Sequence, residues 1–195
     1  DILVIILCIF RHIIKSFLMI FDVQFATLYQ IGAFFLWIIQ FRRVFNLLPI
    51  DDAEDVQEIN ESINLNLNSV IYGCRAFAPL FSSQKFGTII NISSVCAKHA
   101  WDGWSVYAAA KWGVLGFTKG LATELGPSGI RVTCLVPGAG ATNFDKNANF
   151  FDRGATPELK AENIADSIVG IYKLPKHVWV EEMTVWGLDQ VVIPL

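Results

Sequence analysis

Two short β-branched runs with a long helical segment between them constrain the fold of this chain more than any other feature. The runs are Thr88–Ile92 and Ile130–Val136, and the intervening segment 105–125 lacks proline and ends at Gly126-Pro127. Such runs are typical of strands, and a long segment closed by Gly-Pro is typical of a helix. Because a strand–helix–strand crossover makes its two strands parallel, we expect an α/β fold with helices on both faces of a parallel sheet.

The flanking sequence predicts further elements of the same kind. Residues 51–62 are polar and acidic, which suits the N-terminal end of a helix that residues 63–81 continue, with Pro79 straining its last turn. A second helix is expected over 157–172, with a proline at its first position, where proline is tolerated. Residues 178–186 are the last predicted strand. Residues 51–195 therefore read as one α/β region.

Residues 1–50 differ sharply in composition from the rest of the chain. They hold a single glycine and a single proline and are rich in isoleucine, leucine and phenylalanine. Within them, residues 23–41 carry no charge and precede Arg42-Arg43. That length is about enough to span a bilayer, although three glutamines and a threonine keep the hydropathy moderate. We keep two interpretations of this atypical apolar segment: a membrane segment, or sequence that is not part of the evolved protein.

Charge and cysteine usage limit the classes of partner. The net charge of −3 gives no reason to expect a nucleic acid or an anionic membrane surface as partner. The cysteines form no CxxC motif, so we expect reduced, buried thiols in a cytoplasmic protein and no metal site, although a pair of disulfides stays open. The cysteines are Cys8, Cys74, Cys96 and Cys134.

Tyr107 and Lys111 are the first candidates for chemistry. Four residues apart on a helix, they lie on one face, so the ammonium group can sit near the phenol. A nearby cation favours the phenolate and lowers the pKa of a tyrosine by about 1–3 units, which makes a general acid or base. Taken alone, the pair is equally compatible with an exposed lysine beside a half-buried tyrosine.

Two further candidates fall at the ends of the predicted strands. Ser94 follows the strand 88–92, and Pro137-Gly138-Ala-Gly140-Ala-Thr142 follows the strand 130–136. The carboxyl ends of parallel strands line the crevice where such sheets bind ligands, and glycine lets a ligand approach the backbone closely. Each feature alone is also compatible with an ordinary turn. Their joint order and spacing with Tyr107 and Lys111 favour a single site.

Together these motifs resemble the short-chain dehydrogenase/reductase family, over about residues 50–195. The resemblance implies a partial doubly wound, Rossmann-like sheet. It also implies an oxidoreductase that transfers a hydride between NAD or NADP and a secondary alcohol or ketone. The family generally forms oligomers, through the helices that here contain Asn66 and Tyr107. The matching segments are residues 91–94, 107–111, 129–132, Pro137-Gly138 with Thr142, and residues 66–70 with Arg75-Ala76 and Pro79.

The resemblance also implies roles for single residues. Tyr107 would be the acid/base, and Lys111 would lower its pKa and hydrogen-bond the nicotinamide ribose. Ser94 would orient the substrate carbonyl. Asn66 would hold a water that links Lys111 to solvent; the family's Asn-Leu-x-x-Val spacing favours it over Asn64 and Asn68.

The resemblance further assigns the nicotinamide end of the cofactor site to the loop after the second strand. Gly140 stands where the family usually has a β-branched residue. Residues 143–155, with three phenylalanines, would form the mobile substrate loop. The residues expected to line the nicotinamide end are Pro137, Gly138, Gly140 and Thr142, with Thr142 near the carboxamide.

The family's glycine-rich Thr-Gly-x-x-x-Gly-x-Gly turn and its Asn-Asn-Ala-Gly segment are missing from this sequence. Because Asp1–Val4 resembles the opening of the family's fourth strand, we expect residues 5–48 to be translated intron or frame-shifted DNA, with the true N-terminal half upstream. Sequencing the full transcript tests this. Three interpretations follow: an oxidoreductase completed by that half, a truncated inactive product that pairs with intact relatives, or a dehydrogenase anchored through residues 23–41.

Overall fold

The computed structural model describes residue 50, residues 56–140, residues 159–188 and residue 190. The apolar segment 1–49, including the candidate span 23–41, and the predicted substrate loop 143–155 lie outside the described residues. The elements in chain order are α2 (Val56–Ile63), the π-helical turn η2 (Asn64–Asn68), α3 (Ser69–Gln84), β1 (Gly87–Ile92), the 3₁₀ turn η3 (Val95–Ala97), α4 (Ser105–Leu125), the 3₁₀ turn η4 (Gly126–Ser128), β2 (Ile130–Pro137), α6 (Ala161–Lys173) and β3 (Glu182–Val185).

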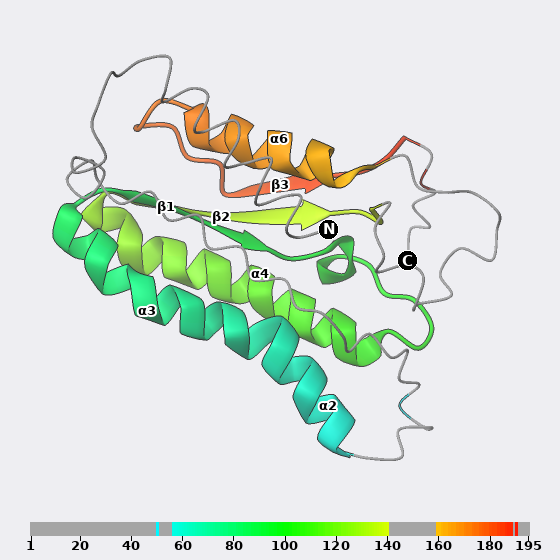
Figure 1. Cartoon of the computed structure of the whole chain (residues 1–195). Coiled ribbons are helices and arrows are strands. Elements are labelled where there is room, and N and C mark those ends of the chain that lie inside the picture. The colour runs from blue at the N-terminus through cyan, green and yellow to red at the C-terminus, as the bar shows by residue number, and fades with distance from the viewer. Residues whose placement is uncertain (1–49, 51–55, 141–158, 189, 191–195) are drawn as a thin grey trace, which may run out of the picture.

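The described strands form one parallel sheet in the order β1-β2-β3. Strand β1 pairs with β2 from Gly87↔Ile130 to Ile92↔Leu135, and β2 pairs with β3 as far as Pro137↔Val185. Helices α3 and α4 cover one face of the sheet and α6 covers the other (Figure 1). The predicted α/β class, with a parallel sheet between helices, is therefore confirmed.

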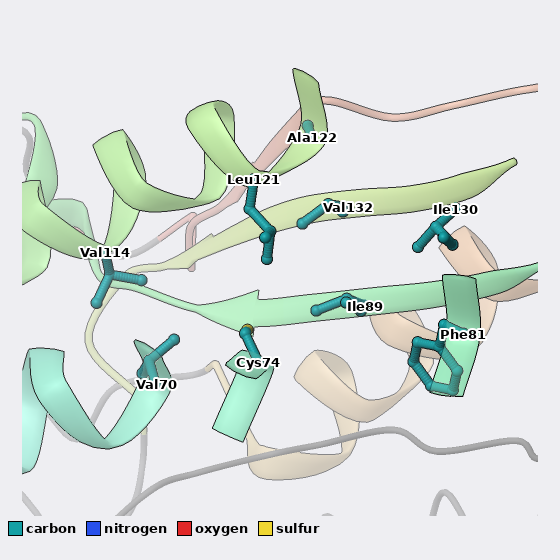
Figure 2. Close-up of a cluster of buried hydrophobic side chains, with 9 residues drawn as sticks. All are labelled: Val70, Cys74, Phe81, Ile89, Val114, Leu121, Ala122, Ile130 and Val132. Atoms are coloured by element: carbon teal, nitrogen blue, oxygen red, sulfur yellow. The ribbon is translucent and has the colours of Figure 1, made fainter. Parts of the chain in front are cut away.

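The face that α3 and α4 cover has a core of tightly packed aliphatic side chains (Figure 2). Val114 is fully buried, and Ile89 and Val132 from neighbouring strands point toward the same helices. Burying such side chains stabilises a fold by about 1.5–3 kcal/mol each. The core consists of Val70, Cys74, Phe81, Ile89, Val114, Leu121, Ala122, Ile130 and Val132.

A second core lies on the α6 face of the same sheet. Ile90 on β1 and Leu135 on β2 contribute their side chains here, because successive residues of a strand point to opposite faces. Ile164, Ile168 and Ile171 meet them from one stripe of α6, at helical spacing. The apolar side chains on both faces of β1 and β2 thus serve a sheet that is covered on both sides.

The first helix ends three residues later than the sequence predicts. Helices α2 and α3 continue through η2 without a break, and α3 passes Pro79 to end at Gln84 rather than at residue 81. It ends because Lys85 adopts the left-handed conformation, with φ of 57°. The predicted strain from Pro79 therefore does not terminate the helix.

Two predicted boundaries are wrong. Helix α6 begins at Ala161 and not near Pro157, since Lys160 is extended and its backbone N–H donates to Asn163 Oδ1 at 2.8 Å, which sets the N-terminus. The last strand spans residues 182–185 rather than 178–186. The residues just before β3 bond to side chains of β2 instead of pairing with its backbone. Arg131 donates to the carbonyl of Val178, and Thr133 donates to the carbonyl of Val180.

The described cysteines are buried and free, namely Cys74, Cys96 and Cys134. This agrees with the prediction of reduced core thiols. No helix within the described ranges has the length and apolar character needed to cross a membrane.

Candidate functional site

Two serines follow β1 and point in different directions. The Ser93 hydroxyl is buried and donates to the backbone carbonyl of Lys111 at 2.9 Å, while the Ser93 N–H donates to Leu135 O at 2.8 Å. Ser94 is fully extended, and its Oγ accepts a hydrogen bond from the Cys96 N–H at 3.2 Å, which caps η3. Ser93 thus ties the end of β1 to α4, and the Ser94 side chain lies at the carboxyl edge of the sheet.

Tyr107 and Lys111 lie one turn apart on α4, as the sequence predicts. The Lys111 ammonium nitrogen is 5.4 Å from the centroid of the Tyr107 ring. Ser94 makes a side-chain hydrogen bond with Tyr107. The structure therefore brings together three of the four predicted catalytic side chains, from the end of β1 and the first turns of α4.

Burial dominates the electrostatics of this trio. Desolvation raises the pKa of Tyr107 well above its ordinary value, Cys96 raises it further, and only the hydrogen bond with Ser94 lowers it. The prediction that Lys111 leaves Tyr107 with a lowered pKa is therefore wrong for this structure. Lys111 is buried too, and desolvation lowers the pKa of its ammonium from 10.5 to about 8.

Asn66, the fourth predicted catalytic residue, lies in the π-helical turn η2. Its side-chain N–H donates to the carbonyl of Ser62 at 3.1 Å, while Asn68 donates to Asn64 Oδ1 at 2.6 Å on an exposed face. The turn packs on α4, since Leu67 fills the space that a side chain at Gly113 would need. π-Helical turns inside α-helices are frequent at functional sites. Asn64 and Asn68 are hydrogen-bonded to each other, whereas the Asn66 side chain bonds to the backbone of Ser62.

The predicted nicotinamide loop leaves β2 at the same edge of the sheet. Pro137 is the last residue of β2, and the Gly138 N–H donates to Val185 O at 2.7 Å. A side chain at Gly138 would collide with Gln190 and with the Trp186 ring, whose Cε3 would lie 2.9 Å from the added carbon. Gly140 follows within the described residues, whereas Thr142 lies outside them. Because β1 and β2 are parallel, Ser94 and Pro137–Gly140 share the carboxyl edge of the sheet.

Sequence reasoning missed several residues around the trio. The Trp104 ring meets the Tyr107 ring edge-on at 5.7 Å, and Cys96 and Ala108 complete that cluster. The spacing of Trp104 and Tyr107, three residues along a helix start, was the available signal. Gln190, by contrast, contacts Ala139 in the loop after β2, 51 residues away, and no local sequence pattern predicts a contact of that range.

Comparison with known proteins gives consistent results. The model of the short chain dehydrogenase family matches residues 46–152, more than half of the chain. An uncharacterized oxidoreductase of Staphylococcus haemolyticus is 32% identical over 130 residues, which are 67% of this chain and 55% of that protein. This chain therefore spans little more than half the length of the curated relatives it matches.

Solved structures resemble the fold as well. The closed form of serine dehydrogenase complexed with NADP⁺ is 26% identical, with a TM-score of 0.70 over 76% of this chain and 63% of that one. A 3-oxoacyl-[acyl-carrier protein] reductase from Brucella melitensis with bound NAD is 30% identical, with a TM-score of 0.58 over 68% of this chain and 52% of that one.

Proposed function

The chain belongs to the short-chain dehydrogenase family, and from that premise we propose that it carries the catalytic half of an NAD(P)-dependent oxidoreductase acting on a secondary alcohol or a ketone. The observation that carries the proposal is the meeting of Ser94, Tyr107 and Lys111 at the carboxyl edge of the sheet. The relatives complexed with NADP⁺ and with NAD support a nicotinamide dinucleotide as cofactor.

The residues at this edge fit the nicotinamide end of such a cofactor. Gly138 presents bare backbone where any side chain would collide with its neighbours. Tyr107 and Lys111 face the same edge from α4 and would reach the ribose. When bound, the dinucleotide supplies or accepts the hydride, and the protein supplies position and proton transfer. The residues that would hold it are Tyr107, Lys111, Pro137, Gly138, Gly140 and Thr142.

The proton is the part of the reaction that this chain's own side chains handle. In carbonyl reduction, Tyr107 O–H donates a proton to the substrate oxygen, and in alcohol oxidation the phenolate takes it back. Ser94 hydrogen-bonds that same oxygen and also Tyr107, so it fixes the distance between them. Because its pKa is raised, Tyr107 is protonated at neutral pH, which is the form that carbonyl reduction requires.

Lys111 supports this transfer from beneath the tyrosine ring. Burial lowers the pKa of its ammonium group to about 8, so that group can release a proton closer to neutral pH than an exposed lysine does. We assign Asn66 the role of holding the water that connects Lys111 with solvent. Its turn η2 packs on α4, which carries Lys111, and the side chains of Asn64 and Asn68 are hydrogen-bonded to each other.

Removing the phenol hydroxyl of Tyr107 tests the proposal. The purified chain is assayed for oxidation of NADH and of NADPH with a panel of cyclic, aliphatic and aromatic ketones. We expect Tyr107→Phe to lower kcat by about 10²–10⁴-fold, the usual contribution of a positioned acid or base. The matched control is Tyr72→Phe on α3, because the Tyr72 side chain is 67% exposed and lies away from the site.

Two outcomes contradict the proposal. Equal loss in Tyr107→Phe and Tyr72→Phe would mean that the phenol of Tyr107 has no special part. A folded wild-type chain that oxidises neither nucleotide with any ketone would favour the truncated, inactive product that pairs with intact relatives, and co-purification with a full-length relative then tests that reading.

A further inference from the structure

Gln190 follows β3 and folds back over the loop that leaves β2. Its side-chain N–H donates to the backbone carbonyl of Ala139, and its backbone N–H donates to Gly187 O at 3.1 Å. The contact joins residues 51 positions apart, so the tertiary fold creates it and local chain geometry does not.

The carboxamide of Gln190 lies against bare backbone at Gly138. The side-chain oxygen of Gln190 occupies the space that a β-carbon at Gly138 would need, and the Trp186 ring also borders that space. This is the surface that the proposed function gives to the nicotinamide end of the cofactor. Gln190 therefore fills a place where only glycine leaves room.

The group that fills this place is chemically the same as the group expected to bind there. Nicotinamide carries a carboxamide, whose N–H₂ donates hydrogen bonds and whose oxygen accepts them, as in glutamine. The carbonyl of Ala139, which now accepts from Gln190, is an acceptor for either one. Two carboxamides cannot occupy one space beside Gly138.

We propose that the Gln190 carboxamide is a built-in competitor that occupies the nicotinamide carboxamide position on Gly138–Gly140 and must swing out before a dinucleotide binds. This inference rests on the proposed function. It adds an autoinhibitory contact, made by the chain itself, to the cofactor end of the site.

The competitor is held loosely enough to be displaced. Its side-chain oxygen is buried without a hydrogen-bond partner, which within the described residues is true of only one other side-chain oxygen, that of Gln84. A buried acceptor without a partner costs free energy that is recovered when the group returns to water. Release of Gln190 thus loses one hydrogen bond but ends one unsatisfied burial, so a ligand faces a low barrier.

Fluorescence titration with NADH, NADPH and reduced nicotinamide mononucleotide tests the inference on the full chain. The variant is Gln190→Ala, and the matched control is Gln84→Ala, which removes the same kind of unsatisfied amide at the end of α3, next to the start of β1. We expect Gln190→Ala to lower Kd by up to about fivefold for every probe that binds, because one neutral hydrogen bond sets the upper limit and the end of the unsatisfied burial offsets part of it. Gln84→Ala should leave Kd unchanged.

The remaining outcomes separate the two proposals. Equal Kd for wild type and Gln190→Ala overturns the competitor and leaves the proposed function standing. Weaker binding by Gln190→Ala also overturns it, because Gln190 would then help to hold the ligand. No binding by any variant overturns both proposals together. Thermal unfolding of each variant confirms that the compared samples are folded.

Discussion

Strand β1 and helix α4 bring polar side chains together at two places, and the two places differ in how well those side chains are satisfied. Midway along the pair, Asn91 meets Thr118. At the carboxyl end, Ser94 meets Tyr107 above Lys111. The midway side chains are buried, whereas Ser94 and Tyr107 are half-buried beside the buried Lys111.

The midway contact is a closed network. Asn91 Nδ2 donates to Thr118 Oγ1 at 3.0 Å, Thr118 donates to the carbonyl of Val114 at 2.6 Å, and Asn91 Oδ1 accepts from the Cys74 thiol at 3.3 Å. It ties β1 to α3 and α4 at once. Buried polar groups with all partners present specify one packing arrangement at little net cost.

The carboxyl end is not balanced in this way. Burial pushes the pKa of Tyr107 up and that of Lys111 down, so each group is held in surroundings that disfavour its charged form. Strongly perturbed ionisable groups gathered at one edge of a sheet are typical of functional sites, and this supports the role proposed for Tyr107 and Lys111. The contrast within one strand–helix pair separates the role of Asn91 from that of Lys111.

Lys111→Met is expected to have the largest effect, because burying Lys111 destabilises the fold while the proposed reaction requires it. Removing a buried ammonium should raise the free energy of unfolding at pH 7 by about 3 kcal/mol, from a pKa that burial lowers from 10.5 to about 8. The same change should abolish ketone reduction. Urea unfolding together with the activity assay measures both effects.

The pH dependence of that gain follows from the direction of the shift. Below pH 8 the lysine is charged in the folded and the unfolded chain, and the folded chain bears the full cost of burial. Between about pH 8 and 10.5 Lys111 keeps its proton longer in the unfolded chain than in the folded chain, so the contribution of Lys111 to stability rises with pH. The buried thiols of Cys74, Cys96 and Cys134, whose pKa burial raises from 9.0 to about 11, lower stability above about pH 9 in the wild type and in Lys111→Met alike. The difference between wild type and Lys111→Met should therefore vanish by pH 10.5. A constant difference across this window would contradict the assigned cause.

Asn91→Ala should have the opposite effect on stability at the midway network. It removes the hydrogen bonds to Thr118 and Cys74 and leaves a small void, so we expect the free energy of unfolding to fall by about 2 kcal/mol. The gain in stability from Lys111→Met, and its disappearance between pH 8 and 10.5, should be the same with alanine as with asparagine at position 91. Chemical unfolding of Asn91→Ala with and without Lys111→Met at pH 7 and pH 10 checks both statements, and a changed gain would mean that the two places are coupled.

Local patterns in the sequence predicted the elements that local chemistry defines. The bounds of α4 are those expected from Gly126-Pro127, and β1 and β2 agree within one residue. The predicted start of α6 was wrong because Lys160 is extended and bonds the Asn163 side chain, a local contact that the proline at 157 concealed. The predicted length of β3 was wrong because distant side chains set it. Arg131 and Thr133 hold the carbonyls of Val178 and Val180, so the chain joins the ladder only at Glu182.

The site was predictable in position but not in its electrostatics. Helical spacing and the shared carboxyl edge of parallel strands bring Ser94, Tyr107 and Lys111 together, as expected. The direction of the Tyr107 pKa depends on how completely Trp104 and Cys96 enclose the ring, and that packing has no signature in the order of residues. The contact of Gln190 with Ala139 could not be predicted either, because it also depends on tertiary packing.

Ser93→Ala is the smallest of these changes and probes the link between the two places. The Ser93 hydroxyl donates to the backbone carbonyl of Lys111, so its loss should cost about 1 kcal/mol of unfolding free energy, the value of one neutral hydrogen bond. Since that bond fixes the backbone and not the ammonium group, the gain in stability from Lys111→Met, and its disappearance between pH 8 and 10.5, should be the same with alanine as with serine at position 93. If Ser93→Ala instead removes that gain, the bond to the Lys111 carbonyl holds the Lys111 side chain in its buried position, and the network and the site are one mechanical unit.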